Sequence, residues 1–404
     1  MKKNAFYIFI IFSAVLALLC ACAEPGRQEI PSATEAPPVE TLFTEPETVP
    51  PATEPLPEFG QTPEPSSTVL TVDGTALPED SFKLGDVLYV RLDGLAQAVG
   101  AVYTEQIGTG AAHTCTAELF GHTMQFHTQS GYMLDDHTVI CLGSEPIFDG
   151  EDWFLPAQEL LRYFGFSVLD DPDGAAVYFT RYPKNDSIPE GKRVPVLMYH
   201  AVSDDCWGST ELFVSPSVLD AQIAALLENG YTLITFEDFD RLDSIEKPVM
   251  LTFDDGYDDN YDYLFPILQK YQVKATVFVI ADDIGKNHKL TADEIREMDA
   301  SGLVSIQSHT MSHNYLSTQN AEQLDYELSQ SKLMLARLTG KEPFVLCYPT
   351  GMYSGLSLEV TAQYYQFGLL MSSGQYVTGQ DPYLIHRYYV PRGLSADSLL
   401  RRIG

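Results

Sequence analysis

The stretch LTFDDGYDDN, residues 251–260, decides how the rest of this chain is interpreted. An apolar step leads into a burst of aspartates at Asp254, Asp255, Asp258 and Asp259. Adjacent carboxylates repel one another unless a cation or water compensates their charge. The stretch therefore raises three alternatives, namely bulk solvent, a calcium ion or a catalytic metal.

Segments typical of strands and helices alternate on both sides of this stretch. We expect strands at 194–199, 249–253, 303–308 and 344–348, and helices at 216–229, 291–302 and 320–340. Alternation at this spacing predicts an α/β fold with a parallel sheet or barrel and helices outside it. In such folds the chemistry collects at the carboxyl ends of the strands.

Polar side chains stand at the expected strand ends, which carry Asp254 and Asp255, His309 and His313, His200, and Tyr348. Two histidines four residues apart can share a metal if their turn is helical. A carboxylate ligand and an open position would complete a catalytic site. Successive side chains of an extended chain point to opposite sides. One aspartate is therefore expected to bind the metal and the other to act as a base.

Calcium and a glycosidase carboxylate pair fit this pattern less well. An EF-hand loop places its glycine after spaced oxygen ligands, whereas Gly256 follows Asp255 directly. A glycosidase carboxylate pair leaves both histidines unexplained. The combination of Asp-Asp-Gly at one strand end with His-x-x-x-His at another favours a catalytic metal centre.

Four motifs resemble those of the polysaccharide deacetylases, carbohydrate esterase family four. They are VLMYHAV (196–202), TFDDGYDDN (252–260), SHTMSH (308–313) and CYPTG (347–351), within a domain that we place at 190–404. The LMYH strand resembles the subgroup that acts on poly-β-1,6-N-acetylglucosamine and related surface glycans. The resemblance implies a distorted (β/α)7 barrel that binds a divalent metal through Asp-His-His. Zn²⁺ is the expected ion, and Co²⁺ or Ni²⁺ would also suit these ligands.

The resemblance also implies a role for each strand-end residue. Asp254 would be the general base, and Asp255 would hold the metal together with His309 and His313. The metal would polarise the amide carbonyl and lower the pKa of a water, from which Asp254 takes a proton. His200 would protonate the leaving amine, and its alternative role is that of a buried structural histidine.

The CYPTG motif and the later LIHR segment depart from the pattern of many family members. The backbone N–H of Tyr348 would help to hold the oxyanion, but Cys347 stands where the family often has an arginine. In LIHR (384–387), His386 could supply the late histidine of many members. Arg387 matches the surface-glycan subgroup instead, and would pair with and orient Asp254.

The remainder of the opening stretch has a simpler interpretation. Tyr257 is expected to pack near the sugar. Asp258 and Asp259 are expected at the first turn of the next helix, where negative charge is favourable. We expect neither of them to take part in the chemistry.

Residues 1–22 resemble a bacterial lipoprotein signal peptide. A lysine pair precedes an apolar run that is short for a membrane span, and Cys22 stands at the lipobox position. An ordinary secretory signal is the alternative. Residues 23–67 are rich in Pro, Glu, Thr and Ser and are expected to form a disordered linker. We therefore expect an extracytoplasmic protein anchored to the cell membrane through lipidated Cys22.

Residues 68–182 contain an internal repeat, in which 85–105 aligns with 150–170. Each copy has the pattern of a strand, an amphipathic helix ended by glycine, and another strand. The region resembles the copper amine oxidase N-terminal-like domain, which implies a small α+β accessory domain and no copper. Its histidines (His113, His122, His127 and His137) are expected to be ordinary side chains, and a Cys115–Cys141 disulfide is left open.

The net charge limits the possible binding partners, and the motifs limit the possible functions. The formal net charge of −32 argues against nucleic acid and against electrostatic adsorption to an anionic membrane. We expect an enzyme that removes N-acetyl groups from N-acetylglucosamine residues of a cell-envelope or extracellular polysaccharide. An O-acetyl esterase with the same metal site and an inactive glycan-binding surface lipoprotein are the alternatives.

Overall fold

The second half of the chain is built on a parallel sheet. The computed structural model describes residues 64–404 apart from 78–80, 107–112, 129–131, 136–137 and 184–186. The strands pair in the order β24 (Phe367–Leu369), β23 (Val345–Cys347), β22 (Val304–Ser308), β21 (Ala275–Val279), β20 (Pro248–Phe253), β16 (Val196–Tyr199) and β26 (Tyr388–Tyr389). Every neighbouring pair in this order is parallel. The predicted α/β fold with a parallel, barrel-like sheet is confirmed.

The segment that leads into β26 connects the two edges of this sheet. The Ile385 N–H donates to the Gly368 carbonyl (2.9 Å), and the Leu370 N–H donates to the Ile385 carbonyl (2.8 Å), both beside β24. Further along, the Val390 N–H donates to the Met198 carbonyl in β16 (3.0 Å). The same segment therefore contacts β24 at one end of the sheet and β16 toward the other end, and it curls the sheet toward a barrel.

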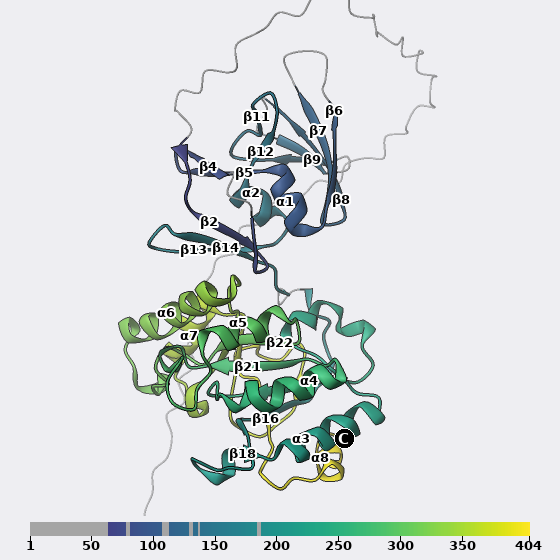
Figure 1. Cartoon of the computed structure of the whole chain (residues 1–404), viewed down its shortest axis with the longest axis vertical. Helices are drawn as coiled ribbons and strands as arrows, with labels where there is room; N and C mark the ends of the chain where they lie inside the picture. Colours follow the sequence, from purple (N-terminus) through teal and green to yellow (C-terminus); the bar gives the residue numbers. More distant parts are fainter. Residues whose placement is uncertain (1–63, 78–80, 107–112, 129–131, 136–137, 184–186) are drawn as a thin grey trace, which may run out of the picture. The chain divides into compact units, whose positions relative to one another are not determined.

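Helices surround these strands (Figure 1). They are α3 (Pro216–Glu228), α4 (Phe265–Tyr271), α5 (Ala292–Ala300), α6 (Ala321–Thr339), α7 (Gly355–Tyr364) and α8 (Ala396–Ile403), with a π-helical turn η4 at Asn260–Leu264. The Thr291 hydroxyl accepts the Glu294 N–H, and the Glu294 carboxylate accepts the Thr291 N–H, so the predicted N-cap of α5 is a capping box. Helix α6 ends at Gly340, whose φ of 72° is a left-handed conformation that suits glycine. The two predicted helices are confirmed with their N-caps and the glycine end of α6, and α5 ends at Ala300, two residues before the predicted limit.

The strands that carry the site are buried on both faces. Every residue of β16, β20, β21 and β22 is buried. Parallel strands covered on both faces have nearly continuous apolar sequences, and VLMY and PVMLTF show this pattern. The polar residues of the motifs begin where these strands end, at one edge of the sheet.

The N-terminal half contains three small sheets and two short helices within the described residues. Its elements are β1 (Glu64–Pro65), β2 (Val69–Val72), β3 (Thr75–Ala76), β4 (Ser81–Leu84), β5 (Val87–Arg91), α1 (Leu92–Val99), β6 (Val102–Gln106), β7 (Thr114–Leu119), β8 (His122–His127), β9 (Tyr132–Asp135), β10 (Thr138–Cys141), β11 (Ile147–Phe148), β12 (Trp153–Pro156), α2 (Ala157–Tyr163), β13 (Ser167–Asp170) and β14 (Ala176–Thr180). Both copies of the repeat are strand–helix–strand units, β5-α1-β6 and β12-α2-β13. The repeat predicted from the sequence is confirmed, and the resemblance of this region to a named domain stays a prediction.

Several predictions concern residues outside this description. The signal peptide, Cys22 and most of the linker lie in 1–63, and the side chain of Cys141 is likewise outside the described part.

Among the histidines of the N-terminal half, His122 is paired with an aspartate, since its Nδ1 lies 3.0 Å from Asp135 Oδ1. None of the described helices combines the length and apolar character needed to cross a membrane.

Candidate active site

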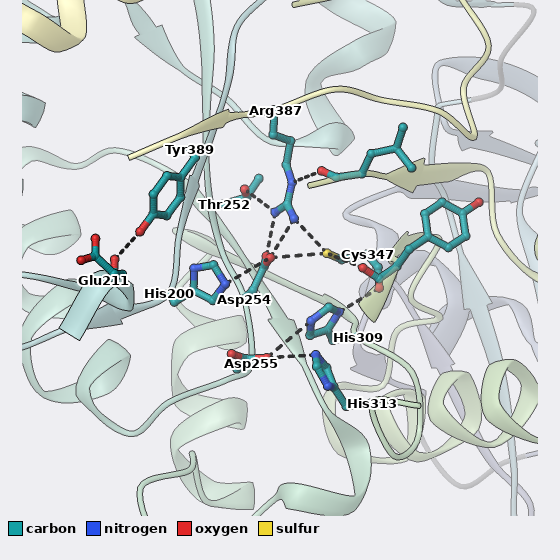
Figure 2. A network of polar contacts seen from close by, with 12 residues as sticks. His200, Glu211, Thr252, Asp254, Asp255, His309, His313, Cys347, Arg387 and Tyr389 are labelled. Carbon is teal, nitrogen blue, oxygen red and sulfur yellow. Dashed lines mark hydrogen bonds and ion pairs between the residues drawn. The ribbon is translucent and has the colours of Figure 1, made fainter. Parts of the chain in front are cut away.

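The polar residues that follow the strands converge on one site (Figure 2). His200 follows β16, Asp254 and Asp255 follow β20, and His309 follows β22. His313 lies on the loop beyond His309, Cys347 is the last residue of β23, and Arg387 lies in the segment that bridges the sheet edges. Because parallel strands end at the same edge, residues far apart in the sequence meet here.

Asp254 and Arg387 form a buried bidentate ion pair. Arg387 Nη1 and Nη2 lie 2.7 Å from Asp254 Oδ1 and Oδ2, and the arginine side chain is 0% exposed. The other N–H groups of the guanidinium donate to the Leu370 carbonyl (2.8 Å), the Thr252 hydroxyl (3.1 Å) and the Cys347 sulfur (3.2 Å). A guanidinium offers five N–H donors, so every donor of Arg387 has a partner. We call Asp254, Arg387, Thr252 and Cys347 the inner network.

Arg387 determines the charge of the inner network. Burial raises the pKa of Asp254, but the Arg387 guanidinium more than offsets burial, so the pKa lies below its ordinary value. Asp254 is therefore held as a carboxylate although it is only 1% exposed. His386 instead lies within 2.8 Å of the Ser372 hydroxyl. The structure thus pairs Asp254 with Arg387, the arrangement expected from the surface-glycan subgroup.

Asp255, His309 and His313 form a second group, which we call the outer cluster. Asp255 Oδ1 lies 3.5 Å from His309 Nε2 and 3.5 Å from His313 Nε2. The Nδ1–H of His309 donates to the Cys347 carbonyl (2.8 Å), which leaves Nε2 directed at Asp255. Metal-bound histidines commonly have their second nitrogen fixed in this way. The ligand atoms of the three residues lie within 4.8 Å of one another, as a shared cation requires. Two imidazoles and a carboxylate suit a divalent ion such as Zn²⁺.

A different trio, Asp254, His309 and Cys347, also brings potential ligand atoms together. Both oxygens of Asp254 already accept from Arg387. Burial raises the pKa of the Cys347 thiol, which keeps it protonated, whereas a metal binds the thiolate. The outer cluster is therefore the better site for a cation.

The backbone of the outer cluster is strained. Asp255, Thr310 and His313 have φ values of 73°, 67° and 57°, in the left-handed region that is unfavourable for residues with a Cβ. The turn from His309 to His313 contains no helix, and the His313 N–H donates to the Thr310 hydroxyl (3.0 Å). The helical turn assumed for His309 and His313 is not formed. The two histidines instead meet Asp255 through a bend.

His200 is buried beside the inner network. Its Nε2 lies 3.9 Å from Asp254 Oδ2, and the residue is 6% exposed. Burial lowers the pKa of His200, and the carboxylates of Asp254 and Asp255 oppose this effect. His200 therefore lies where it could exchange a proton with a group bound above Asp254.

Asp259 and Asn260, neither of them expected at the site, support the His200 loop. The Asn260 side-chain amide donates to the His200 carbonyl (3.1 Å) and to Asp259 Oδ1 (2.9 Å). The same Asp259 oxygen accepts the Val202 N–H (3.0 Å). Asp259 does precede the helical turn η4, as expected, but it is 3% exposed and its carboxylate holds the chain around His200. In the sequence, the signal for this role is the pair Asp259-Asn260, which follows Asp254 and Asp255 closely.

The predicted oxyanion contact through Tyr348 is wrong. The backbone N–H of Tyr348 donates to the Leu369 carbonyl (3.0 Å) as part of the β23–β24 pairing. Because this N–H is used in the sheet, it cannot also donate to an oxyanion in the site. The Tyr348 side chain is 0% exposed and packs in an apolar cluster with Leu346 and Leu370.

A barrel-like parallel sheet with this arrangement of carboxylates and histidines at its strand ends defines a hydrolase site. The model of the polysaccharide deacetylase family matches residues 242–366, which include Asp254, Asp255, His309, His313 and Cys347. The Bacillus subtilis (strain 168) protein YxkH, whose name places it among the polysaccharide deacetylases, is 34% identical over 213 residues, or 51% of this chain and 74% of that protein. The chain therefore belongs to the polysaccharide deacetylase family and is a deacetylase, a class of hydrolase.

More distant relatives and solved structures agree with this assignment. The poly-β-1,6-N-acetyl-D-glucosamine N-deacetylase of Staphylococcus aureus (strain MRSA252) is 24% identical over 208 residues, covering 47% of this chain and 70% of that protein. The crystal structure of BC0361, a polysaccharide deacetylase from Bacillus cereus, has a TM-score of 0.51 and 25% identity, covering 75% of this chain and 99% of that one. The Streptococcus pyogenes deacetylase PplD has a TM-score of 0.50 and 27% identity, covering 53% of this chain and 99% of that one.

Proposed function

We propose that this protein is a metal-dependent N-deacetylase acting on N-acetylglucosamine residues of a cell-envelope or extracellular polysaccharide. One observation carries the proposal, namely that Asp255 Oδ1 lies 3.5 Å from the Nε2 atoms of both His309 and His313, beside an aspartate that Arg387 holds ionised. The similarity to a poly-β-1,6-N-acetyl-D-glucosamine N-deacetylase supports the substrate class.

The outer cluster would hold a divalent cation, and Zn²⁺ fits the ligands best. A cation bound there would polarise the amide carbonyl and favour ionisation of the attacking water. The other steps, which are proton transfer and orientation of the reacting groups, depend on side chains of the protein. Asp255 and the two histidines orient the site, and the hydrogen bond from His309 to the Cys347 carbonyl fixes the tautomer of that ring.

Asp254 is the proposed general base. Each carboxylate oxygen has about two acceptor positions, so Asp254 keeps acceptor capacity for a water proton while Arg387 binds both oxygens. The inner network fixes the direction of the carboxylate. It also makes Asp254 a weaker base than a free aspartate, because the guanidinium lowers its pKa.

His200 is the proposed acid that protonates the leaving amine. In amide hydrolysis the amine nitrogen would leave as an unstable anion unless it receives a proton. The oxygen of an ester leaves more readily without one. His200 faces Asp254 from the end of β16, and Asn260 holds its backbone carbonyl. The imidazole would give a proton to the amine nitrogen, while Asp254 takes a proton from the attacking water. The alternative function is an O-acetyl polysaccharide esterase that uses the same site.

Acetate release from a panel of polymers tests the function. The full chain would be incubated with poly-β-1,6-N-acetylglucosamine, peptidoglycan, N-acetylated chitin oligomers and O-acetylated xylan, with and without a chelator. We expect chelator-sensitive release from an N-acetylated polymer, restored by Zn²⁺ or Co²⁺. Release from xylan alone would support the esterase, and release unaffected by chelation would contradict the metal site. His200→Ala should reduce amide hydrolysis far more than ester hydrolysis.

The location and the N-terminal half belong to the same proposal. We propose that residues 1–22 direct secretion, that Cys22 carries the lipid anchor and that 23–67 link it to the folded part. The region 68–182 would then be an accessory domain of the copper amine oxidase N-terminal-like type. Incorporation of a labelled fatty acid into the wild-type chain, and its loss in Cys22→Ala, would test the anchor.

A further inference from the structure

Trp207 is an exposed tryptophan close to the active site. It lies between β17 (Ala201–Val202), which follows His200 directly, and the 3-10 turn η2 (Thr210–Leu212). Its side chain is 39% exposed, whereas the other tryptophan of the chain, Trp153, is 3% exposed. A single exposed apolar side chain is common on protein surfaces, so the contacts of this indole with the active-site turn decide its interpretation.

Three aromatic rings hold the indole in place. The His288 ring lies parallel to it, with centroids 4.2 Å apart and an interplanar angle of 6°. The rings of Tyr257 and Phe213 meet it edge to face at 4.8 Å and 5.0 Å. Both geometries are favourable for aromatic pairs. The indole is therefore a supported ring and not a freely moving surface side chain.

The same contacts tie the indole to the turn that carries Asp255. Tyr257 follows Asp255 by two positions, and Lys289 Nζ lies 4.2 Å from the centroid of the Tyr257 ring. Lys289 also donates to the Asp255 carbonyl (2.8 Å). The Asp258 N–H donates to the His288 carbonyl (3.4 Å), so His288 and Asp255 are joined through one short turn. These contacts place the indole next to the turn that carries Asp255 of the outer cluster.

We propose that Trp207 forms a sugar-binding subsite, in which its indole stacks on a pyranose ring next to the residue being deacetylated. This inference rests on the proposed function and names where a neighbouring sugar of the N-acetylglucosamine polymer binds. One face of such a pyranose presents C–H groups, which carry partial positive charge and match the negative face of an aromatic ring. A ring already supported by His288 loses little conformational freedom when it binds.

A neutral polymer also suits the net charge of the chain. The whole chain has a formal net charge of −32, which disfavours an anionic polysaccharide. Stacking on an indole requires no charge on the ligand. The subsite would therefore select for polymer length and for the apolar face of the sugar, and the chemistry at Asp254 and Asp255 would select for the acetyl group.

Intrinsic fluorescence offers a direct test, because the chain has two tryptophans. In a Trp153→Phe, Asp254→Asn chain, Trp207 is the remaining tryptophan and turnover is blocked. We expect a saturable change in its emission on titration with N-acetylated β-1,6- or β-1,4-linked glucosamine pentamers. An emission spectrum unchanged up to millimolar pentamer would overturn the subsite. This readout needs no catalysis, so it judges the subsite even if the chain releases no acetate from any polymer.

Kinetics provide the second test. Trp207→Ala should raise KM for the pentamer about tenfold and lower kcat less than twofold, since a stacking contact of about 1.4 kcal/mol corresponds to tenfold in affinity. Trp207→Phe should recover part of this loss. Tyr326→Ala, which removes a 54% exposed ring from α6, is the matched control and should leave KM unchanged. A Trp207→Ala enzyme that loses kcat at constant KM, or a Trp207→Phe enzyme no better than it, would contradict stacking.

Discussion

The inner network and the outer cluster lie side by side but are built differently. In the inner network, Arg387 is 0% exposed and each of its N–H donors has a partner. In the outer cluster, Asp255 Oδ1 faces two imidazole nitrogens at 3.5 Å, longer than an ordinary hydrogen bond. The first group is complete without a ligand, whereas the second has the ligand atoms of a cation site.

The backbone conformation also differs between the inner network and the outer cluster. Asp254 follows an extended strand, and its N–H donates to the Tyr199 carbonyl of β16 (3.0 Å). Asp255, the next residue, has a φ of 73°, and His313 has a φ of 57°. Strained conformations of this kind persist where the surrounding fold imposes them. One peptide bond therefore divides a carboxylate held by the sheet from a carboxylate turned out toward the histidines.

Asp254→Asn should have the largest effect on catalysis. The amide cannot accept a proton from water, and we expect kcat to fall by about 10³-fold, within the usual range for a general base. The outer cluster keeps all its ligands, so the variant should bind Zn²⁺ as wild type does. Acetate release and metal content after dialysis measure the two properties separately. Near-native turnover would show that Asp254 is not the base.

His309→Ala should break the outer cluster and leave the ion pair of the inner network in place. Loss of one of three protein ligands should weaken Zn²⁺ binding by about 10²-fold or more, and activity should fall with it at limiting metal. Titration against a fluorescent zinc chelator measures the affinity. His122→Ala is the matched control, since His122 is paired with Asp135 in the N-terminal half. Tight zinc binding by His309→Ala would refute this ligand set.

Arg387→Met should expose the dependence of Asp254 on its partner. Burial alone raises the pKa of Asp254, and Arg387 reverses that direction. Without the guanidinium, Asp254 stays protonated to a higher pH, so the acidic limb of the kcat/KM profile should move upward. Removing one partner of a buried ion pair should also cost about 3–5 kcal/mol in the free energy of unfolding. An unchanged acidic limb in a folded variant would mean that another group controls it.

The sequence predicted the strand ends well because their signals are local. Apolar runs such as PVMLTF, the Thr291 cap and Gly340 each depend on a few neighbouring residues. Arg387 was also placed beside Asp254, through its resemblance to a family pattern and not through periodicity. Its five contacts go to four residues in three separate segments, and no pattern along the chain encodes them.

The errors arose where backbone hydrogen bonds are set by distant strands. The Tyr348 N–H is used by Leu369, and this pairing depends on β24 lying next to β23. The bend between His309 and His313 depends on left-handed residues that spacing alone does not reveal. Asp259 was expected only at the first turn of the next helix, but its carboxylate also accepts the N–H of Val202, a residue far away in the sequence.

Asp259 gives the smallest expected effect on catalysis, and it links the support of the His200 loop to the stability of the fold. Burial raises its pKa to about 6, above the ordinary value of 3.8. The folded state therefore binds a proton more tightly than the unfolded state. This contribution to stability is fully present below about pH 4 and is lost as the pH rises through about 6. By neutral pH the loss amounts to roughly 3 kcal/mol, at about 1.4 kcal/mol for each pKa unit.

Asp259→Asn keeps an oxygen to accept the Val202 N–H but removes the ionisation. Urea unfolding at several pH values should show that the variant gains stability relative to wild type between pH 4 and 7. At pH 4 the two proteins should be nearly equal. Parallel stability curves would show that Asp259 does not ionise in this range. Asn260 binds both Asp259 and the His200 carbonyl. The variant therefore distinguishes the effect of these hydrogen bonds on His200 from the effect of the Asp259 charge. An amidase activity that stays near the wild-type value in Asp259→Asn means that the geometry of the hydrogen bonds, and not the carboxylate charge, positions the acid.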